Sequence, residues 1–436
     1  MKTENEFENQ NKTKTNRPGM KLLIIAAICV GLLIPQALIR NLIDERYYTA
    51  NEASNDVYQK WSGQQEICGP IIKVPWRAKD ANGAFTGTTF DVYLLPENLN
   101  IKGNVNTKTL NRGIFDCIVY DSPLEITGSF TLPKEFDSTL INNILYHQTR
   151  LIIGIEDLRG LTDNISMTYG SEQLEMESGT YTSKLNGVSC KIDIKPLIEG
   201  EKIDFTLVLP LKGSESLSFI PIGRTTAVNL TSDCPTPSFN GNYLPIEREV
   251  NDSGFAASWK ILALNRDYSQ VINENLKQPL VTSSFGVDLK VPVKQYQQTT
   301  RASKYAIIII FLTFAIVFFV EIRKDTPIHP VQYLLIGVAL LVFYVLLLSF
   351  SEHCAFWFSY LIASLMTVGL ISVYLFGILK IRKTAISVGA WLSVAYLLIY
   401  VLLQMENFAL LVGSIIVFAV VGLCMYASQK INWYKK

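Results

Sequence analysis

Histidine is scarce in this chain: only His147, His329 and His353 occur among 436 residues. No HExxH, Walker, GxSxG or CxxC motif is present, so the usual sequence signs of a metalloenzyme, a nucleotide-dependent enzyme or a serine hydrolase are missing. The net charge is only +1, whereas a nucleic-acid-binding protein needs a clustered basic surface. We therefore expect no metal or other cofactor and no nucleic-acid partner, and we favour a non-enzymatic protein.

Hydrophobic residues, in contrast, are abundant: they make up 49% of the chain, and the mean hydropathy is +0.23. Soluble chains usually have a negative mean. The average also conceals a division, because the last third is almost entirely apolar, whereas the middle is rich in Thr, Ser, Asn, Asp and Lys. The length and this division predict a membrane-embedded part and a soluble part on one chain.

Six apolar stretches are long enough to cross a hydrocarbon core of about 30 Å, which takes about 20 helical residues. They cover residues 22–39, 305–320, 331–349, 355–379, 385–403 and 408–428. Stretches of this length in lipid must be helices, since every backbone polar group has to be satisfied within its own segment. These stretches therefore predict that the chain is embedded in a lipid bilayer.

The first stretch is preceded by Lys12, Lys14, Arg17 and Lys21, as the apolar part of a secretory signal peptide would be. It is as long as a full span, however, and no small-residue cleavage site follows it. We therefore interpret it as an uncleaved membrane anchor rather than as a signal peptide.

Basic residues in the short loops predict the orientation of the helices. They occur in the N-terminal tail, after the second stretch, after the fourth stretch and in the C-terminal tail, whereas loops 351–354 and 404–407 have none. All the basic loops lie on the cytoplasmic side if six helices cross the membrane and both termini are inside. This predicts a multi-pass protein of a bacterial inner membrane, with a cytoplasmic tail (1–21), a first helix (22–39), a periplasmic domain (40–301), a five-helix block (305–428) and a second cytoplasmic tail (429–436).

The segment outside the membrane is predicted to be mainly β. Short stretches rich in β-branched and aromatic residues, bounded by Gly, Pro, Asn or Asp, occur at residues 88–96, 115–121, 124–132, 189–194 and 202–211. Helical patterns are limited to residues 41–61, which extend the first helix, and to the short amphipathic stretch 134–146. We expect an antiparallel, sandwich-like domain in two layers or two subdomains.

Seven cysteines are present, and the predicted periplasmic domain contains four of them: Cys68, Cys117, Cys190 and Cys234. Disulfides persist in such an oxidising compartment, so one or two are expected among these four. Three complete pairings exist, and the sequence does not choose among them. Cys29 and Cys424 lie within apolar stretches, where we interpret them as small apolar side chains.

Candidate functional residues of the membrane part lie at the two ends of the third stretch. Glu352 and His353 follow it, and ionisable residues at membrane depth tend to be functional. His329 and Gln332 lie at its start, and a helix of about 24 residues would separate the two histidines by roughly 36 Å. The competing interpretation is that all four residues are polar caps at the membrane interfaces. Glu321, in the preceding loop, is expected to pair with a neighbouring base.

Long strings of this sequence resemble the CreD family of inner-membrane proteins. The most specific are RASKYAIIIIFLTFAIVFFVE (301–321), IHPVQYLLIGVALLVFYVLLLSFSEH (328–353) and ALLVGSIIVFAVV (409–421). The soluble part adds ICGPIIKVP (67–75), NRGIFDCIVY (111–120), FIPIGRTTAVNLTS (219–232), PSFNGNYLP (237–245) and GFAASWKILALNR (254–266). The resemblance covers nearly the whole chain and departs from the family pattern at Cys234 and Lys294.

The resemblance implies a protein of cell-envelope integrity, linked to a two-component envelope response and to tolerance of colicins and envelope-active agents. It implies no catalytic residues, because the family has none that are agreed. Three functions are compatible with the sequence. The first is a non-enzymatic envelope protein whose external domain binds a periplasmic or cell-wall partner. The second is a transporter or flippase-like conduit for an envelope component, and the third is a membrane-embedded hydrolase that uses Glu352 and His353.

Overall fold

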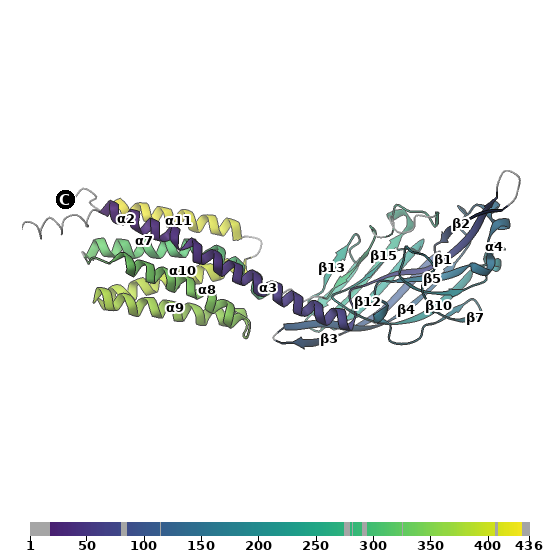
Figure 1. Cartoon of the computed structure of the whole chain (residues 1–436), viewed down its shortest axis with the longest axis horizontal. Coiled ribbons are helices and arrows are strands. Elements are labelled where there is room, and N and C mark those ends of the chain that lie inside the picture. Colours follow the sequence, from purple (N-terminus) through teal and green to yellow (C-terminus); the bar gives the residue numbers. More distant parts are fainter. Residues whose placement is uncertain are drawn as a thin grey trace, which may run out of the picture. The chain divides into compact units, whose positions relative to one another are not determined.

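The computed structural model describes residues 18–79, 85–113, 115–273, 280, 282–289, 294–324, 326–405 and 409–429. Most of the two predicted cytoplasmic tails, including Lys12, Lys14 and Arg17, lies outside these residues. The chain divides into two compact units, one formed by Met1–Asn51 with Val293–Lys436 and the other by Glu52–Pro292. We call them the helix unit and the β unit (Figure 1).

The helices follow the predicted apolar stretches closely. They are α2 (Pro18–Gly31), α3 (Leu33–Trp61), α6 (Lys294–Lys304), α7 (Ala306–Lys324), α8 (Pro330–Ser351), α9 (Phe356–Leu379), α10 (Arg382–Gln404) and α11 (Ala409–Gln429). The end of α3 at Trp61 confirms that residues 41–61 extend the first helix and lead into the β unit.

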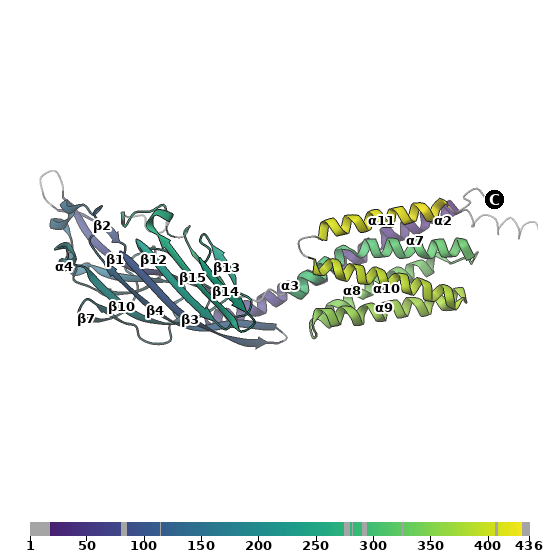
Figure 2. The ribbon, with the colours of Figure 1, turned by 180° about the vertical axis from the view of Figure 1, so that it is seen from behind.

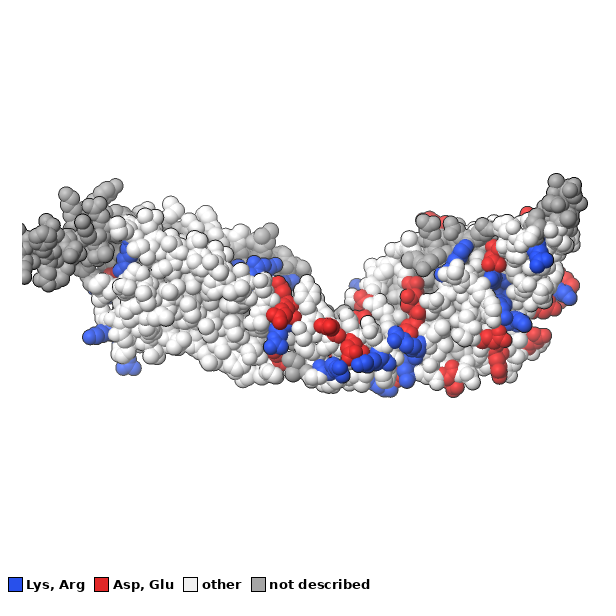
Figure 3. Space-filling model, viewed as in Figure 1, with Lys and Arg blue, Asp and Glu red and all other residues white. Residues whose placement is uncertain are grey.

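Several of these helices suit a membrane. Within the described residues, five helical segments are long and apolar enough to cross one: Gly19–Trp61, Ala306–Lys324, Pro330–Ser351, Phe356–Leu379 and Arg382–Gln404. The sixth predicted stretch forms α11, a helix of 21 residues. On the face shown in Figure 3, the helix unit is almost free of charged side chains between its two ends, as a lipid-facing surface requires.

Helices α8, α9 and α10 lie side by side in the helix unit (Figure 2). Aromatic rings pack among these three helices. Phe343 of α8 lies 5.4 Å from Tyr360 of α9 and 4.6 Å from Tyr396 of α10, measured between ring centroids. The Tyr360 hydroxyl donates a hydrogen bond to the backbone oxygen of Tyr396 at 2.8 Å. Lipid chains are as apolar as these side chains, so it is close ring packing and this hydrogen bond that favour the helix contacts.

The β unit consists of two sheets. Among the described strands, the nine-stranded sheet contains β1 (Gln65–Lys79), β2 (Phe85–Leu94), β5 (Arg150–Ile155), β8 (Glu177–Ser178), β9 (Gly187–Lys191), β11 (Ser216–Phe219), β13 (Ser238–Gly241), β16 (Val271–Asn273) and β17 (Phe285–Asp288). The eight-stranded sheet contains β3 (Asn98–Arg112), β4 (Phe115–Phe130), β6 (Ser166–Tyr169), β7 (Glu172–Glu175), β10 (Ile203–Ser214), β12 (Thr225–Ser232), β14 (Glu247–Asn251) and β15 (Gly254–Leu262).

One hydrophobic core joins the two sheets, as expected for a sandwich of two layers. Along β10, buried and exposed residues alternate over most of the strand, so one face of this strand points into the core and the other points away from it. All six residues of β5 are buried instead, because this strand lies in the middle of its sheet between β1 and β9. The prediction of a large, mainly-β domain is confirmed.

The strand pairing differs from the prediction in two respects. The sheets are not wholly antiparallel, since β1 pairs with β11 and β3 pairs with β12 in parallel. In addition, the predicted strands 115–121 and 124–132 form the single strand β4. Pro123 lies opposite Pro210 of β10. The pairing of β4 with β3 is interrupted at this position, so the N–H that proline lacks is not needed for a hydrogen bond to β3.

The amphipathic helix predicted at residues 134–146 does not form. Residues Ser138–Asn143 form the short 3-10 helix η1, in which no residue is buried, and a second 3-10 turn, η2, covers Tyr146–Gln148. The Asp137 carboxylate accepts hydrogen bonds from the backbone N–H and the hydroxyl of Thr139, which favours a tight turn. Leu140 and Ile141 of this segment are only partly buried against the core, so a longer helix would gain little from packing.

The four cysteines considered for disulfides are free and buried in the structure. Cys68 and Cys190 belong to β1 and β9, with β5 between them, and Cys117 belongs to β4, which β3 separates from the strand before Cys234. Two strand spacings are about 9.6 Å, whereas the Cα atoms of a disulfide are less than about 7 Å apart. These positions exclude the pairs Cys68–Cys190 and Cys117–Cys234, and all four cysteines are free in the structure.

Candidate functional site

His329 and Gln332 form the N-terminal cap of α8. The His329 Nδ1 atom accepts a hydrogen bond from the N–H of Val331 at 3.3 Å, and the Gln332 Oε1 atom accepts one from the N–H of His329 at 2.9 Å. Pro330, which has no N–H to satisfy, begins the helix. These contacts satisfy backbone donors that the first turn of a helix leaves unpaired. The geometry therefore agrees with the interpretation of these two residues as caps.

Glu352 caps the other end of α8, and only 10% of its side chain is exposed. Its Oε1 atom accepts a hydrogen bond from the Tyr296 hydroxyl at 3.0 Å and lies 4.0 Å from Nε of Arg46. We call Arg46, Tyr296 and Glu352 the Glu352 cluster. It links α3, α6 and the end of α8. His353 is exposed; its backbone N–H donates to the Phe350 oxygen at 3.0 Å, and its ring forms no hydrogen bond or ion pair with a residue that the structure describes.

The four candidate residues therefore do not form one site. The 22 residues of α8 separate the two pairs, which corresponds to about 33 Å along a helix axis. Glu352 and His353 are adjacent in sequence but differ in surroundings, since only the carboxylate is enclosed.

Glu321 has a base partner, as expected, but the base is Lys21 of α2 rather than a neighbour in its own loop. Glu321 is 7% exposed. Its carboxylate also accepts hydrogen bonds from the Tyr333 hydroxyl at 2.8 Å and from the N–H of Ile328 at 3.0 Å. These contacts, which we call the Glu321 cluster, attach the first helix to α7 and α8.

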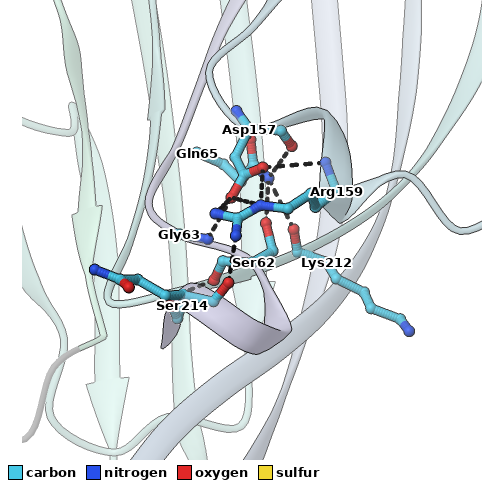
Figure 4. A network of polar contacts seen from close by, with 8 residues as sticks. Ser62, Gly63, Gln65, Asp157, Arg159, Lys212 and Ser214 are labelled. Atoms are coloured by element: carbon cyan, nitrogen blue, oxygen red, sulfur yellow. Dashed lines mark hydrogen bonds and ion pairs between the residues drawn. The ribbon is translucent and has the colours of Figure 1, made fainter. Parts of the chain in front are cut away.

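A polar network in the β unit surrounds the end of α3 (Figure 4). The Gln65 amide nitrogen donates hydrogen bonds to the Ser62 hydroxyl at 2.9 Å, to the Asp157 backbone oxygen at 2.9 Å and to the Lys212 backbone oxygen at 3.0 Å. Gly160 lies against this amide, and a Cβ atom there would be only 2.3 Å from the Gln65 nitrogen. The absence of a side chain at this position allows the close approach.

Asp157 is the charged centre of this network. Its carboxylate accepts a hydrogen bond from the N–H of Gly63 at 2.8 Å and others from the Arg159 guanidinium at 2.6 and 2.9 Å. The Arg159 guanidinium also donates to the backbone oxygen of Gln59 in α3. The hydrogen bonds from Arg159, followed by the one from Gly63, hold the pKa of Asp157 well below its usual range.

The network also joins the two ends of the β unit. Ser214 donates to the backbone oxygens of Ser62 and Gly63, at 2.7 and 3.1 Å. The next residue, Glu215, accepts a hydrogen bond from the Gln64 amide and, through its backbone oxygen, another from the N–H of Leu289 at 2.7 Å. We call this set the tether junction: Gln59, Ser62, Gly63, Gln64, Gln65, Asp157, Arg159, Ser214, Glu215 and Leu289.

Within the tether junction, Glu215 itself has an unusual backbone conformation, with a φ of 61°. This left-handed conformation is uncommon for a residue other than glycine and persists where surrounding contacts impose it. Leu289 is the last residue described before the chain returns to the helix unit. The chain therefore enters and leaves the β unit at one place.

No sequence pattern predicted the tether junction, because its residues are far apart along the chain. Gln65 and Asp157 are 92 positions apart, and Gln65 and Lys212 are 147 apart. The only local signal is the stretch from Asp157 to Gly160, in which an Asp side chain accepts from the backbone two residues later, as in a common turn. Such a pattern predicts a turn but not its distant partners.

The polar groups at these sites mainly form hydrogen bonds and ion pairs that hold structural elements together. Glu321, Glu352 and Asp157 each accept hydrogen bonds from donors on other elements. Within the described residues, no group of three or more His, Cys, Asp or Glu side chains is arranged to hold a metal ion.

Comparison with known proteins agrees with this architecture. A family model described as inner membrane protein CreD matches residues 17–434. The chain is also 33% identical, over 422 residues, to inner membrane protein CreD of Escherichia coli (strain K12); the match covers 92% of this chain and 91% of that protein. A match of this extent includes both the apolar helices and the β unit, and the chain belongs to the CreD family of inner membrane proteins.

Proposed function

We propose that this chain is a non-enzymatic protein of cell-envelope integrity that crosses a bacterial inner membrane six times, with α11 as the sixth crossing. Both termini would be cytoplasmic and the β unit periplasmic. The resemblance to CreD proteins suggests that its level follows a two-component envelope response and affects tolerance of colicins and envelope-active agents. Its molecular role would be to present the β unit to a protein partner in the periplasm or cell wall.

The tether junction is the observation that carries this proposal. A domain attached at one point by two chain segments is restrained in its orientation more than a domain on a single flexible linker. Glu215 receives hydrogen bonds from both segments, through its side chain and its backbone. This arrangement suits a module that must be held and presented near the membrane.

An exposed apolar surface of the β unit supports partner binding. Leu264 is 93% exposed, and Leu244, Ile246 and Leu262 are also exposed large hydrophobic residues. The Tyr243 hydroxyl donates to the Asn265 backbone oxygen at 2.7 Å, and the N–H of Ile246 donates to the Ser258 oxygen at 2.8 Å, so the segments that carry these side chains lie together. We call the four side chains the apolar edge patch.

The apolar edge patch adjoins β14, which ends the order of its sheet and pairs only with β15 among the described strands. All five residues of β14 are exposed. A partner segment in an extended conformation would gain backbone hydrogen bonds from this edge and apolar contacts from the patch. Contiguous apolar residues on a surface commonly mark such interaction sites.

Rescue of a deletion strain under colicin and envelope stress tests the proposal. The double variant Leu244→Asp/Leu264→Asp should fail to rescue although its level in the membrane is unchanged. The control is Val208→Asp, which places one such charge at another exposed apolar residue of the β unit. Full rescue by the double variant would refute partner binding at the apolar edge patch, and failure of the control to rescue would show that any added charge is harmful.

The role as a conduit has one observation in its favour. Among the described residues, the hydroxyls of Tyr344 and Tyr396 are buried without a hydrogen-bond partner, and Tyr396 lines a groove of about 400 Å³ between α9 and α10. Unpaired hydroxyls at membrane depth are costly, and a permeating polar group would satisfy them. Flux of an envelope precursor in reconstituted vesicles, lost in Tyr396→Phe, would establish this function in place of the first.

The hydrolase alternative depends on Glu352 and His353 and has its own test. Glu352→Gln keeps an acceptor for the Tyr296 hydroxyl, and His353→Ala removes an exposed ring, so neither should harm the fold. If the protein is non-enzymatic, both variants should rescue the deletion strain at normal levels. Loss of rescue with normal levels of both variants would favour a catalytic site at this end of α8.

A further inference from the structure

An open apolar groove of about 820 Å³ lies among α2, α7 and α11 of the helix unit. Its walls include Leu22 and Val30 of α2, Phe311 and Phe319 of α7, and Met425 of α11. Several of these side chains are exposed in the structure. An apolar ligand in the groove would cover these exposed side chains.

The groove has the depth of one membrane leaflet. Its lining extends from Leu22 to Val30 along α2 and from Phe311 to Phe319 along α7, a separation of eight positions in each helix. Eight helical residues span about 12 Å, and half of a hydrocarbon core of about 30 Å is about 15 Å. The acyl chains of a single lipid would therefore lie along the groove within one leaflet.

One end of the groove is basic. Lys21 immediately precedes Leu22, and Arg323 and Lys324 form the last turn of α7, beyond Phe319. The ion pair of Lys21 with Glu321 brings the start of α2 and the end of α7 together at this end. Arg323 and Lys324 are exposed, and neither forms an ion pair with a residue that the structure describes.

We propose that this groove is a binding site for an anionic glycerophospholipid, whose acyl chains lie between α2, α7 and α11 and whose phosphate headgroup meets Arg323 and Lys324. An acyl chain gains little free energy when it moves from the surrounding lipid into an apolar groove, because both surroundings are equally apolar. The chains therefore determine where the lipid lies and not which lipid is bound. The headgroup supplies the selection, because each basic residue near an anionic lipid favours it by roughly 5-fold. Two such residues give a preference of about 25-fold over a zwitterionic lipid with the same chains.

Charge complementarity distinguishes this occupant from a second copy of the chain. Among the residues that the structure describes, the end of the groove presents Lys21, Arg323 and Lys324 against the carboxylate of Glu321, which Lys21 already engages. A second copy would bring the same excess of positive charge to this end and repel it. An anionic lipid instead neutralises Arg323 and Lys324, and its chains cover the exposed phenyl rings of α7.

Native mass spectrometry of the full-length protein, titrated with phosphatidylglycerol and with phosphatidylcholine of identical chains, tests the proposal. We expect one phosphatidylglycerol to be retained with about 25-fold preference. The double variant Arg323→Gln/Lys324→Gln should lose this preference. The matched control is Arg382→Gln/Lys383→Gln, which removes the same two charges at the start of α10, outside the groove, and should keep it.

A second variant tests binding of the acyl chains in the groove without changing any charge. Ala26 lines the groove, and Ala26→Phe would obstruct it while keeping every cation, so retained phosphatidylglycerol should fall to the level of phosphatidylcholine. Equal retention of the two lipids by the wild type would overturn the proposal. So would unchanged retention by Ala26→Phe, which would indicate surface attraction only, or a lipid-free dimer that Ala26→Phe dissociates, which would indicate a second copy.

Discussion

Replacing Asp157 by Asn should weaken the tether junction without changing its shape. The carboxylate is 14% exposed and accepts hydrogen bonds from Gly63 and Arg159. A hydrogen bond to a charged group contributes about 1.5–3 kcal/mol, whereas an ion pair with an exposed partner such as Arg159 adds at most about 1 kcal/mol. Taking the lower part of this range, we expect Asp157→Asn to lower the free energy of unfolding of the β unit by about 2 kcal/mol.

The free cysteines of the β unit allow this loss to be measured in the full-length protein. Cys68, Cys117 and Cys190 are each at most 2% exposed, and burial raises the pKa of the Cys190 thiol to about 11, so folded protein should react slowly with a thiol reagent. Labelling of each cysteine with increasing temperature, followed by peptide mass spectrometry, reports unfolding of this unit alone. A loss of about 2 kcal/mol corresponds to a midpoint lowered by roughly 4–8 °C in a domain of this size.

The pH dependence of the effect has a defined sign. Because the pKa of Asp157 is lowered by folding, its contribution is fully present above the pKa of an unfolded Asp, about 3.9, and is lost as the pH falls through the folded value. Urea unfolding followed by tryptophan fluorescence should thus show the full difference between wild type and Asp157→Asn at pH 7 and pH 5, and a smaller one at pH 3.5.

The matched control for these measurements is Asp163→Asn, since within the described residues of the β unit the Asp163 carboxylate accepts a hydrogen bond only from the adjacent N–H of Asn164. It should leave the midpoint within about 0.5 kcal/mol of wild type, as surface substitutions usually do. An equal loss in the control, or a deficit of Asp157→Asn that grows at low pH, would refute the reasoning.

Three further outcomes are expected. Gly160→Ala should destabilise the β unit by about 1–3 kcal/mol, because its Cβ would lie 2.4 Å from the Lys212 oxygen, whereas Gly87→Ala, with open space around it, should be nearly neutral in the same labelling assay. Dithiothreitol should not change the thermal midpoint of the β unit, since its described cysteines are free. Glu321→Gln should speed hydrogen exchange in α2, because it leaves the Lys21 ammonium without its ion pair, and Lys21→Met in the same chain should restore the slow exchange.

The helices could be predicted closely because each apolar stretch contains its own signal. The stretch predicted at 355–379 forms α9 at Phe356–Leu379, and that at 331–349 forms α8 at Pro330–Ser351. Every backbone group of such a helix bonds within the same segment, so no distant residue is needed to set its limits. The strands were located less well, since their limits depend on partners: β1 pairs with β11 about 150 positions later.

The sites were predicted in part, for the same physical reason. The sequence indicated that His329, Gln332 and Glu352 lie at the ends of a helix, and their roles there follow from neighbouring backbone groups. It also indicated that Glu321 needs a base, but the nearest bases in sequence, Arg323 and Lys324, form no ion pair with it in the structure, and the partner, Lys21, is 300 positions away. Such a contact is decided by the packing of α2 against α7 and α8, which no local pattern encodes.

The polar side chains of the first helix show why a simple membrane anchor would not replace it. Lys21 pairs with Glu321, the buried Gln36 amide donates to the Ser303 backbone oxygen at 2.8 Å, and Arg46 lies 4.0 Å from the Glu352 carboxylate. These contacts fasten the helix near its start, at its middle and beyond the apolar stretch. Polar groups are costly at membrane depth unless they are paired, so each one specifies a single arrangement of this helix against the C-terminal helices. The same helix continues to Trp61, next to the tether junction of the β unit.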